Sequence, residues 1–328
     1  MQVGGQAVLE GVMMRAPGAV ATAVRCADGE IVVRKDPFVS LTDTSRLCKL
    51  PVVRGAVGLV EMLLLGIRML NFSAEVALRS TDSLKGQNGS GGNGQGRLHG
   101  KKEHAFALAV TIAASIAIGL AIFFVTPLVV ATAFFQVAQD PLRFNLLAGA
   151  IRIVLFLGYL GGISSLKDIQ RLFAYHGAEH KAVFAFERGV PLNVANAALQ
   201  SRFHPRCGTS FILIVLVVAI ALFSLLDSLL VMWLGNITLL TRLVTHLPLI
   251  PLVGGISYEL IKVSAKHSNA PLGRAIAAPG LWLQRLTTRQ PDERQLEVAL
   301  VALRSALGVG LEREGTSQLL MVGEISQN

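Results

Sequence analysis

The sequence predicts an α-helical polytopic membrane protein with about four transmembrane helices, a small β-rich cytoplasmic N-terminal portion and cytoplasmic C-terminal helices. The first observation is composition: 52% of the 328 residues are hydrophobic and only 16% are charged, which is too apolar for one soluble core. The second is the run from Ala105 to Phe135, which has no charged side chain and exceeds the ~20 residues that cross a bilayer. The third is the alternation of basic residues between successive loops.

The first 50 residues are expected to form the β-rich portion. Val20 to Arg25 alternates partly, Asp28-Gly29 is a hairpin-turn dipeptide, and Glu30 to Arg34 supplies the return strand. Before them, Gln6 and Glu10 are polar residues in an apolar, glycine-punctuated segment. Turn and strand positions explain this pattern, and a substrate-facing role is the alternative.

A mostly apolar helix is predicted from Val52 to Leu78. Charged residues recur along it at intervals of seven and form one slowly drifting stripe: Arg54, Glu61, Arg68 and Glu75. A spanning helix would have to hide these charges within protein, so we expect the helix to lie on the membrane surface or to pack against other helices. The glycine- and asparagine-rich residues 85–97 follow as a flexible linker.

Three further spans follow the first one. Phe144 to Leu166 is the second, with Arg152 towards its outer end, where it could snorkel or pair. Gly208 to Leu226 is the third. The fourth, roughly Leu243 to Tyr258, is weaker and contains His246, Pro248 and Pro251, so a broken or re-entrant helix is expected there. Residues 228–240 are read as interfacial or as part of a longer irregular span.

The C-terminal region predicts one clear helix. Pro291 begins it, Asp292 and Glu293 suit its first turn, and Gly308 can end it. Its apolar stripe is Leu296, Leu300, Leu303 and Leu307. The predicted order of segments is a cytoplasmic β-rich segment with an amphipathic helix (1–84), a flexible linker (85–102), a first transmembrane hairpin (103–167), a cytoplasmic His/Cys loop (168–207), a second transmembrane hairpin (208–262), cytoplasmic helices (263–314) and a disordered tail (315–328).

Charge placement predicts the orientation in the membrane. The net charge is +9, and basic residues gather before the first span, between the second and third, and after the fourth: Lys101, Lys102, Lys167, Arg171, Lys181, Arg188, Arg202, Arg206, Lys262, Lys266 and Arg274. The two other loops carry little more than Arg143 and Arg242. By the positive-inside rule, this predicts a multi-pass protein of the cell (inner) membrane with both termini and the His/Cys loop in the cytoplasm. The absence of a secretory signal and of a disulfide framework among three cysteines agrees.

The chemistry is concentrated in the His/Cys loop. Leu166 to Glu187 is expected to be one helix, ended by Gly189 and Pro191. His176-x-x-Glu179-His180 places two imidazoles on one helix face, in the H-x-x-E-H order of inverted zinc proteases. In that arrangement the histidines bind the metal and the glutamate takes a proton from water.

His204 and Cys207 could complete the metal shell. If His176, His180, His204 and Cys207 all bind, the site is closed and resembles a structural zinc; if one of the last two only supports the others, an open position remains for catalysis. The bland alternative is a hydrogen-bonded polar cluster with a packed cysteine. Glu187 and the pair Tyr258-Glu259 are weaker acidic candidates, better read as helix-end or interface residues.

At these residues the chain resembles the YqhQ family of bacterial inner-membrane proteins. The resemblance covers nearly the whole chain and rests on GGQAVLEGVMMR at 4–15, YHGAEHK at 175–181, HPRCGTSF at 204–211, GISYE at 255–259 and LTTRQPD at 286–292. It implies membrane location and metal dependence of an enzyme, and it supplies neither substrate nor reaction. The linker at 85–97 departs from the family pattern and is read as a tolerated insertion.

The leading hypothesis is a zinc-type inner-membrane hydrolase acting at the cytoplasmic surface on a membrane-associated peptide or other amide or ester. Its metal ligands would be His176, His180, His204 and Cys207, with Glu179 as the general base, and Cys/His ligation favours Zn²⁺ among divalent metals. The alternative is a non-enzymatic scaffold with a structural metal that binds another membrane or cytoplasmic protein. A transporter is a third class, disfavoured by few intramembrane ionisable residues. The lipid bilayer is the expected partner, and nucleic acid is not, because the basic residues flank apolar spans.

Overall fold

The computed structural model describes residues 3–87, 101–134, 140–267, 270–309 and 319–322. Most of the predicted linker and most of the predicted tail lie outside these residues, but Leu319–Val322 of the tail forms a strand where disorder was expected. The chain divides into two compact units. The sheet unit comprises Met1–Gly89, Gly161–Ile212 and Gly254–Asn328, and the helical unit comprises Ser90–Leu160 and Leu213–Val253.

The sheet unit contains the predicted N-terminal strands. β1 (Gly4–Val8), β2 (Gly11–Ala16), β3 (Gly18–Arg25) and β4 (Ile31–Phe38) form an antiparallel meander, and β5 (Leu319–Val322) adds in parallel to β4. The predicted hairpin at Asp28-Gly29 is confirmed, with Gly29 in the left-handed region at φ 97°. The β-rich portion is shorter than expected, because α1 (Leu41–Thr44) and a 3-10 turn (Leu47–Lys49) follow Phe38.

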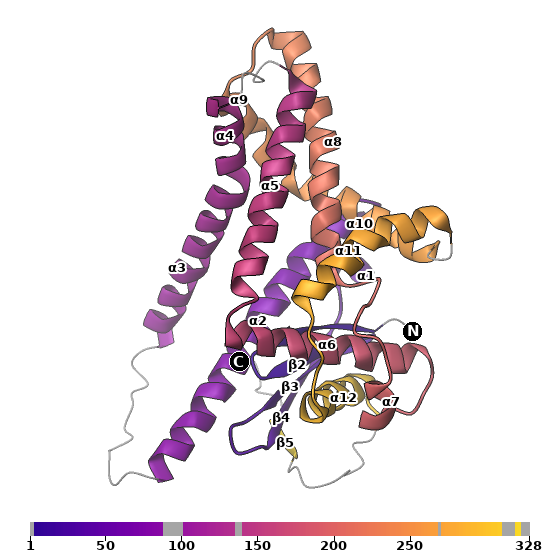
Figure 1. The fold of residues 1–328 in the computed structure, drawn as a ribbon. Helices are drawn as coiled ribbons and strands as arrows, with labels where there is room; N and C mark the ends of the chain where they lie inside the picture. The colour runs from indigo at the N-terminus through magenta and orange to yellow at the C-terminus, as the bar shows by residue number, and fades with distance from the viewer. Residues whose placement is uncertain (1–2, 88–100, 135–139, 268–269, 310–318, 323–328) are drawn as a thin grey trace. The chain divides into compact units, whose positions relative to one another are not determined.

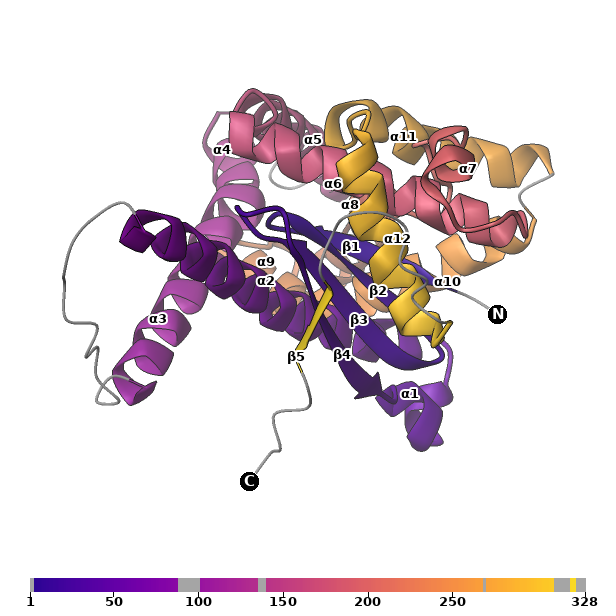
Figure 2. The same cartoon turned by 90° about the horizontal axis from the view of Figure 1, so that it is seen from below.

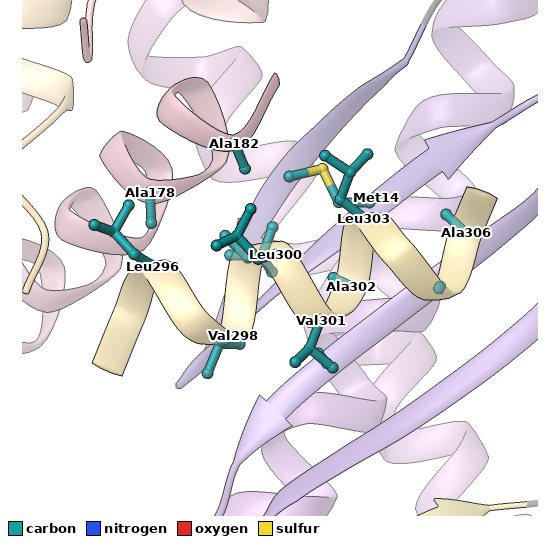
Figure 3. Packing of buried hydrophobic residues seen from close by; sticks show 14 of the residues in the cluster. Met14, Ala178, Ala182, Leu296, Val298, Leu300, Val301, Ala302, Leu303 and Ala306 are labelled. Carbon is teal, nitrogen blue, oxygen red and sulfur yellow. The ribbon is translucent and has the colours of Figure 1, made fainter. Parts of the chain in front are cut away.

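The sheet is covered on both faces because its apolar side chains alternate. Met14 belongs to a core shared with α6 (Lys167–Glu187) and α12 (Glu293–Leu307), whereas Met13, one residue earlier, packs towards α2 (Val53–Gln87). Figure 2 shows α12 crossing the sheet. Figure 3 shows its leucines beside Met14, Ala178 and Ala182. The predicted leucine stripe is therefore confirmed as the core-facing side of α12.

Capping explains where α12 begins. Asp292 is the N-cap: its carboxylate accepts from the Gln295 amide at 2.7 Å, while the Gln295 side chain accepts from the Asp292 amide at 3.0 Å. The helix therefore starts at Glu293, two residues after the predicted Pro291. Gly308 ends it at φ 70°, as expected.

The charged stripe of α2 finds partners within the sheet unit. Arg54 forms an ion pair with Glu259, and the Glu61 carboxylate accepts from the Ser40 hydroxyl and the Leu41 amide, both at 2.6 Å. The predicted helix is confirmed, and within the described residues it extends to Gln87.

Among the described residues, four helical segments are long and apolar enough to cross a membrane, as predicted: Val110–Phe134, Pro141–Ile163, Phe211–Leu234 and Leu239–Ser264. They are built from α3 (Lys101–Leu120), a π turn (Ala121–Val125) and α4 (Thr126–Phe134), then α5 (Pro141–Ile163), α8 (Gly208–Leu234), and finally α9 (Leu239–His246), a 3-10 turn (Leu247–Leu249) and α10 (Ile250–Lys266) (Figure 1). The fourth is broken at its prolines, as expected. The region 228–240 is mostly an extension of α8.

A polar cluster lies within the helical unit. The Asp227 carboxylate accepts from Arg242 Nε at 2.9 Å and from the side-chain nitrogen Nδ2 of Asn145 at 2.8 Å. It also lies 2.9 Å from His246 Nε2. Arg152, expected to snorkel or pair, is buried with its guanidinium 5.6 Å from the Phe124 ring centroid. These polar groups are enclosed among apolar helices. Burying charged groups there costs free energy unless they are paired.

Candidate metal centre

α6 places two histidines on one face, as the spacing predicts. The helix runs from Lys167, after the extended Leu166, to Glu187, and Gly189 at φ 65° turns the chain away before Pro191. The ring centroids of His176 and His180 lie 4.5 Å apart. Both side chains therefore project from successive turns into the same small region.

Backbone carbonyls orient both imidazoles. His176 Nδ1 lies 2.8 Å from the Thr287 carbonyl oxygen, and His180 Nδ1 lies 2.5 Å from that of Arg202. Because a carbonyl only accepts, each Nδ1 carries the proton and donates it, which leaves a lone pair on each Nε2. Metal-binding histidines are commonly fixed in this way.

Cys207 supplies a third donor atom. It lies immediately before α8, and its Sγ is 3.2 Å from His176 Nε2 and 3.5 Å from the Thr209 amide nitrogen. Ligand atoms of His176, His180 and Cys207 all lie within 4.8 Å of one another. Zinc bonds of ~2.0 Å to nitrogen and ~2.3 Å to sulfur put neighbouring tetrahedral ligands about 3.5 Å apart. The donor types suit zinc, the 3.2 Å between His176 Nε2 and Cys207 Sγ is close to this spacing, and the separations among the three donors extend to at most 4.8 Å.

A cavity of about 120 Å³ adjoins the three donors. Its walls come from the start of β1, from α6 and from the loop before α8: Val3, Gly4, Gly5, His176, Glu179, His180, Val183, His204, Arg206, Cys207 and Gly208. This volume exceeds the ~10–15 Å³ that one water needs by the same measure. A small ligand therefore has room beside the donors.

Glu179 lies in the cavity wall with a buried side chain. One of its carboxylate oxygens is 3.5 Å from His180 Nε2. Burial raises the pKa of Glu179 to about 7, although the nearby His176 ring and a hydrogen bond from the Gly5 amide lower it in part. Its carboxyl group is therefore able to gain and lose a proton near neutral pH.

His204 lines the same cavity but has different hydrogen-bond partners. Its ring centroid is 5.6 Å from that of His180, its Nδ1 accepts from the Arg206 amide at 3.3 Å, and its Nε2 lies 3.3 Å from the Glu187 carboxylate. Burial is the main cause that lowers the pKa of His204 to about 4, and the nearby His180 ring adds to it. The structure thus brings three of the four predicted ligands together and gives His204 other partners.

The supporting contacts were not found from the sequence. The Gln284 side chain accepts from the His204 amide at 2.7 Å and donates to its carbonyl at 2.8 Å, which fixes the loop that carries Cys207. Thr287 and Arg202 orient the two imidazoles through their backbone carbonyls, and every residue type has such a carbonyl, so the sequence gives no signal for this role. Of the weaker candidates, Glu187 pairs with Arg206 and Glu259 with Arg54, in agreement with structural roles.

Comparison with known proteins gives a family without a reaction. A family model described as "Protein of unknown function (DUF1385)" matches residues 50–309. The "Uncharacterized protein YqhQ" of Bacillus subtilis (strain 168) is 34% identical over 312 residues, which cover 93% of this chain and 92% of that protein. No solved structure matches.

Proposed function

This chain belongs to the DUF1385 or YqhQ family, and from the geometry of its site we propose that it is a zinc-dependent hydrolase of the cell membrane. The observation that carries the proposal is the convergence of three donors of the zinc-binding types on the wall of a cavity that also holds a buried carboxyl group. His176, His180 and Cys207 would hold the metal. The H-x-x-E-H order within α6 supports the same reading.

Three protein donors and adjoining space favour an open site over a closed one. Bound there, zinc would supply Lewis acidity and make water acidic enough to react near neutral pH. Glu179 would accept a proton from the attacking water and return it to the leaving group, a role that suits its position in the cavity wall 3.5 Å from His180 Nε2. The Gly5 amide would hold the carboxyl group in the cavity wall.

We place this site at the cytoplasmic membrane surface. The basic residues between the second and third spans and after the fourth support this orientation by the positive-inside rule. Cys207 precedes α8 directly, and the apolar span within α8 starts at Phe211, so the donors lie about one helical turn from a membrane-crossing segment. A substrate anchored in the membrane, such as a peptide or another amide or ester, would fit this location.

A structural metal is the second candidate, and the position of His204 supports it. Its ring lies in the same cavity as the donors. A ring rotation that turned one nitrogen towards them would give a closed shell of one thiolate and three imidazoles. The protein would then be a membrane scaffold whose metal fixes the 168–207 loop for a partner protein.

The decisive experiment is metal content with X-ray absorption on the detergent-purified protein, wild type beside Cys207→Ser. We expect one zinc per chain, with one sulfur, two imidazole nitrogens and a light-atom position that exchanges with solvent. A shell of one sulfur and three nitrogens would favour the structural metal. Absence of stoichiometric metal from zinc-supplemented preparations would contradict both proposals and leave a hydrogen-bonded cluster.

Glu179→Gln separates catalysis from metal binding. The amide cannot accept the proton, so the rate should fall about 10²–10⁴-fold, the usual contribution of a general base. Zinc content should remain that of the wild type. Hydrolysis of a nitrophenyl ester by the zinc-loaded protein, with and without a chelator, is the measurement. Loss of zinc in this variant would instead make Glu179 a ligand.

A further inference from the structure

The outer side of α2 presents an apolar surface that the described part of the chain leaves largely exposed, although Leu59 also reaches Gly254 in α10. Its other side packs on the sheet through Leu65 and Met69. The outer apolar surface consists of Leu59, Val60, Leu63 and Leu64, whose exposed fractions are 42%, 55%, 56% and 62%. Four large aliphatic side chains exposed side by side on two successive turns form a patch that a soluble helix would not keep in water.

The beginning of α2 contacts a membrane-crossing segment. A Cβ on Gly255 would lie 2.3 Å from the Val52 carbonyl oxygen, and a Cβ on Gly55 would lie 2.7 Å from Tyr258 Cβ. The two backbones therefore touch where both residues are glycine. Gly255 and Tyr258 belong to α10 and lie inside the span Leu239–Ser264. The first turns of α2 thus lie at the depth of a segment that is apolar enough to be in lipid.

The charges of this part of α2 are already paired within the protein. Arg54 pairs with Glu259, and Glu61 accepts two hydrogen bonds. Pairing reduces the cost of bringing both groups near lipid. Just before the helix, exposed Leu47 and Leu50 stand beside exposed Arg46 and Lys49, a combination that suits the acyl boundary and its anionic headgroups.

The outer side of α2 changes character after Leu64. At 100° per residue, Arg68, Asn71 and Glu75 fall on the same side as Val60 and Leu64, and all three are exposed. Leu70 and Leu78, with exposed fractions of 40% and 68%, also lie on the outer side. The continuous apolar patch therefore ends at Leu64, and a mixed surface of charged and apolar residues follows it. This change has the form of a membrane boundary crossed by the helix.

We propose that the outer side of α2 from Leu59 to Leu64 is embedded in the lipid bilayer at its headgroup–acyl boundary and that the helix leaves the membrane near Arg68. Lipid is the occupant, with anionic headgroups at Arg46 and Lys49. The sheet is thereby held against the membrane, because the opposite side of α2 packs on β1 to β3. This inference requires no metal and does not rest on the proposed reaction.

Photo-crosslinking in reconstituted vesicles tests this proposal. p-Benzoylphenylalanine replaces Leu64, or Glu75 as the matched control on the same side of the same helix, and the full chain is placed in phosphatidylcholine–phosphatidylglycerol vesicles. Mass spectrometry after irradiation should show about tenfold more lipid adduct at position 64 than at 75, because only the former contacts acyl chains.

Three outcomes would overturn the proposal. Equal lipid adducts at both positions would remove the boundary near Arg68. A cross-linked dimer through position 64 would show that a second copy of the chain covers the surface. Absence of any adduct at position 64 would show that water covers this surface. The control is that the same protein elutes as an intact chain and that a probe placed at Val217 in α8 does react with lipid.

Discussion

At the scale of single residues, the two ring nitrogens decide which histidines can bind a metal. His176 and His180 donate from Nδ1 to carbonyls and keep a lone pair on Nε2. His204 has the opposite arrangement, because its Nδ1 accepts from an amide and its Nε2 therefore donates towards Glu187. All three residues are histidines. Only their hydrogen-bond partners distinguish the two that present a free lone pair from His204, which lines the cavity wall.

This difference predicts unequal effects on zinc affinity. Cys207→Ser should weaken binding by about 100-fold or more, since loss of a ligand exceeds the 10–100-fold effect of changing an outer partner. His204→Gln should stay within about tenfold of the wild type by the same reasoning. Competition with a fluorescent zinc chelator measures both. Equal losses in the two variants would make His204 a ligand.

The buried His204 also predicts a pH dependence of stability. Its pKa is about 4 in the folded protein and ~6.5 when unfolded, so the unfolded state binds the proton more readily. Its contribution is complete above pH ~6.5 and is lost as the pH falls towards 4, by up to about 3 kcal/mol. Hydrogen exchange of the loop amides in chelator-treated protein should show this loss, and His204→Gln should remove that part of it. An unchanged pH profile in the variant would contradict the assignment.

At the scale of elements, α6 is held where the donors need it by a close backbone approach. A Cβ on Gly177 would lie 2.1 Å from the Arg289 carbonyl oxygen, and the Arg289 amide donates to the Phe173 carbonyl at 2.9 Å. The segment after α11 (Pro271–Thr287) therefore lies directly on α6. Thr287, the last residue of α11 and two residues before Arg289, supplies the carbonyl that orients His176.

Gly177→Ala should consequently push α6 away from this segment. We expect a destabilisation of about 1–3 kcal/mol, the usual cost of overpacking, together with weaker zinc binding because the Thr287 carbonyl would lose its position. Gly158→Ala in α5 is the control, since no atom lies within 4 Å of its added Cβ, and it should be neutral or slightly stabilising. Thermal unfolding and zinc titration of both variants measure these effects. Equal stability and equal zinc affinity of the two variants would contradict the close approach of α6 to Arg289.

The elements of this chain were predictable where local rules apply. The hairpin at Asp28-Gly29, the ends of α6 at Leu166 and Gly189, and the four apolar spans follow from turn chemistry, helix termination and length. The candidate donor pair His176 and His180 follows from helical periodicity. The position of His204, the carbonyl partners at Arg202 and Thr287, and the placement of α12 on the sheet depend on contacts between residues far apart in sequence, which one sequence does not encode in residue types.

At the scale of the whole molecule, the candidate metal centre and the buried polar cluster around Asp227 fall into different units. His176, His180 and Cys207 belong to the sheet unit, whereas the cluster of Asp227, Arg242 and His246 belongs to the helical unit. Asp227 neutralises a buried arginine that also lies 3.5 Å from the Phe144 ring centroid. This cluster therefore pairs charges within the helical unit and contributes no donor to the candidate metal centre.

Separate cores predict independent effects of mutations in the two units. Asp227→Ala removes the carboxylate that balances Arg242 and should destabilise the helical unit by about 3–5 kcal/mol, while zinc affinity stays at the wild-type value. Because mutations at distant sites without shared partners are additive within ~0.5 kcal/mol, Asp227→Ala combined with Cys207→Ser should change the stability of the detergent-solubilised protein by the sum of the two separate effects.

Asp227→Asn, which keeps the side-chain volume, replaces Asp227→Ala in these measurements if the alanine variant does not assemble in the membrane. A loss of zinc affinity in either Asp227 variant would contradict this independence, because it would mean that the Asp227 cluster and the candidate metal centre are energetically coupled.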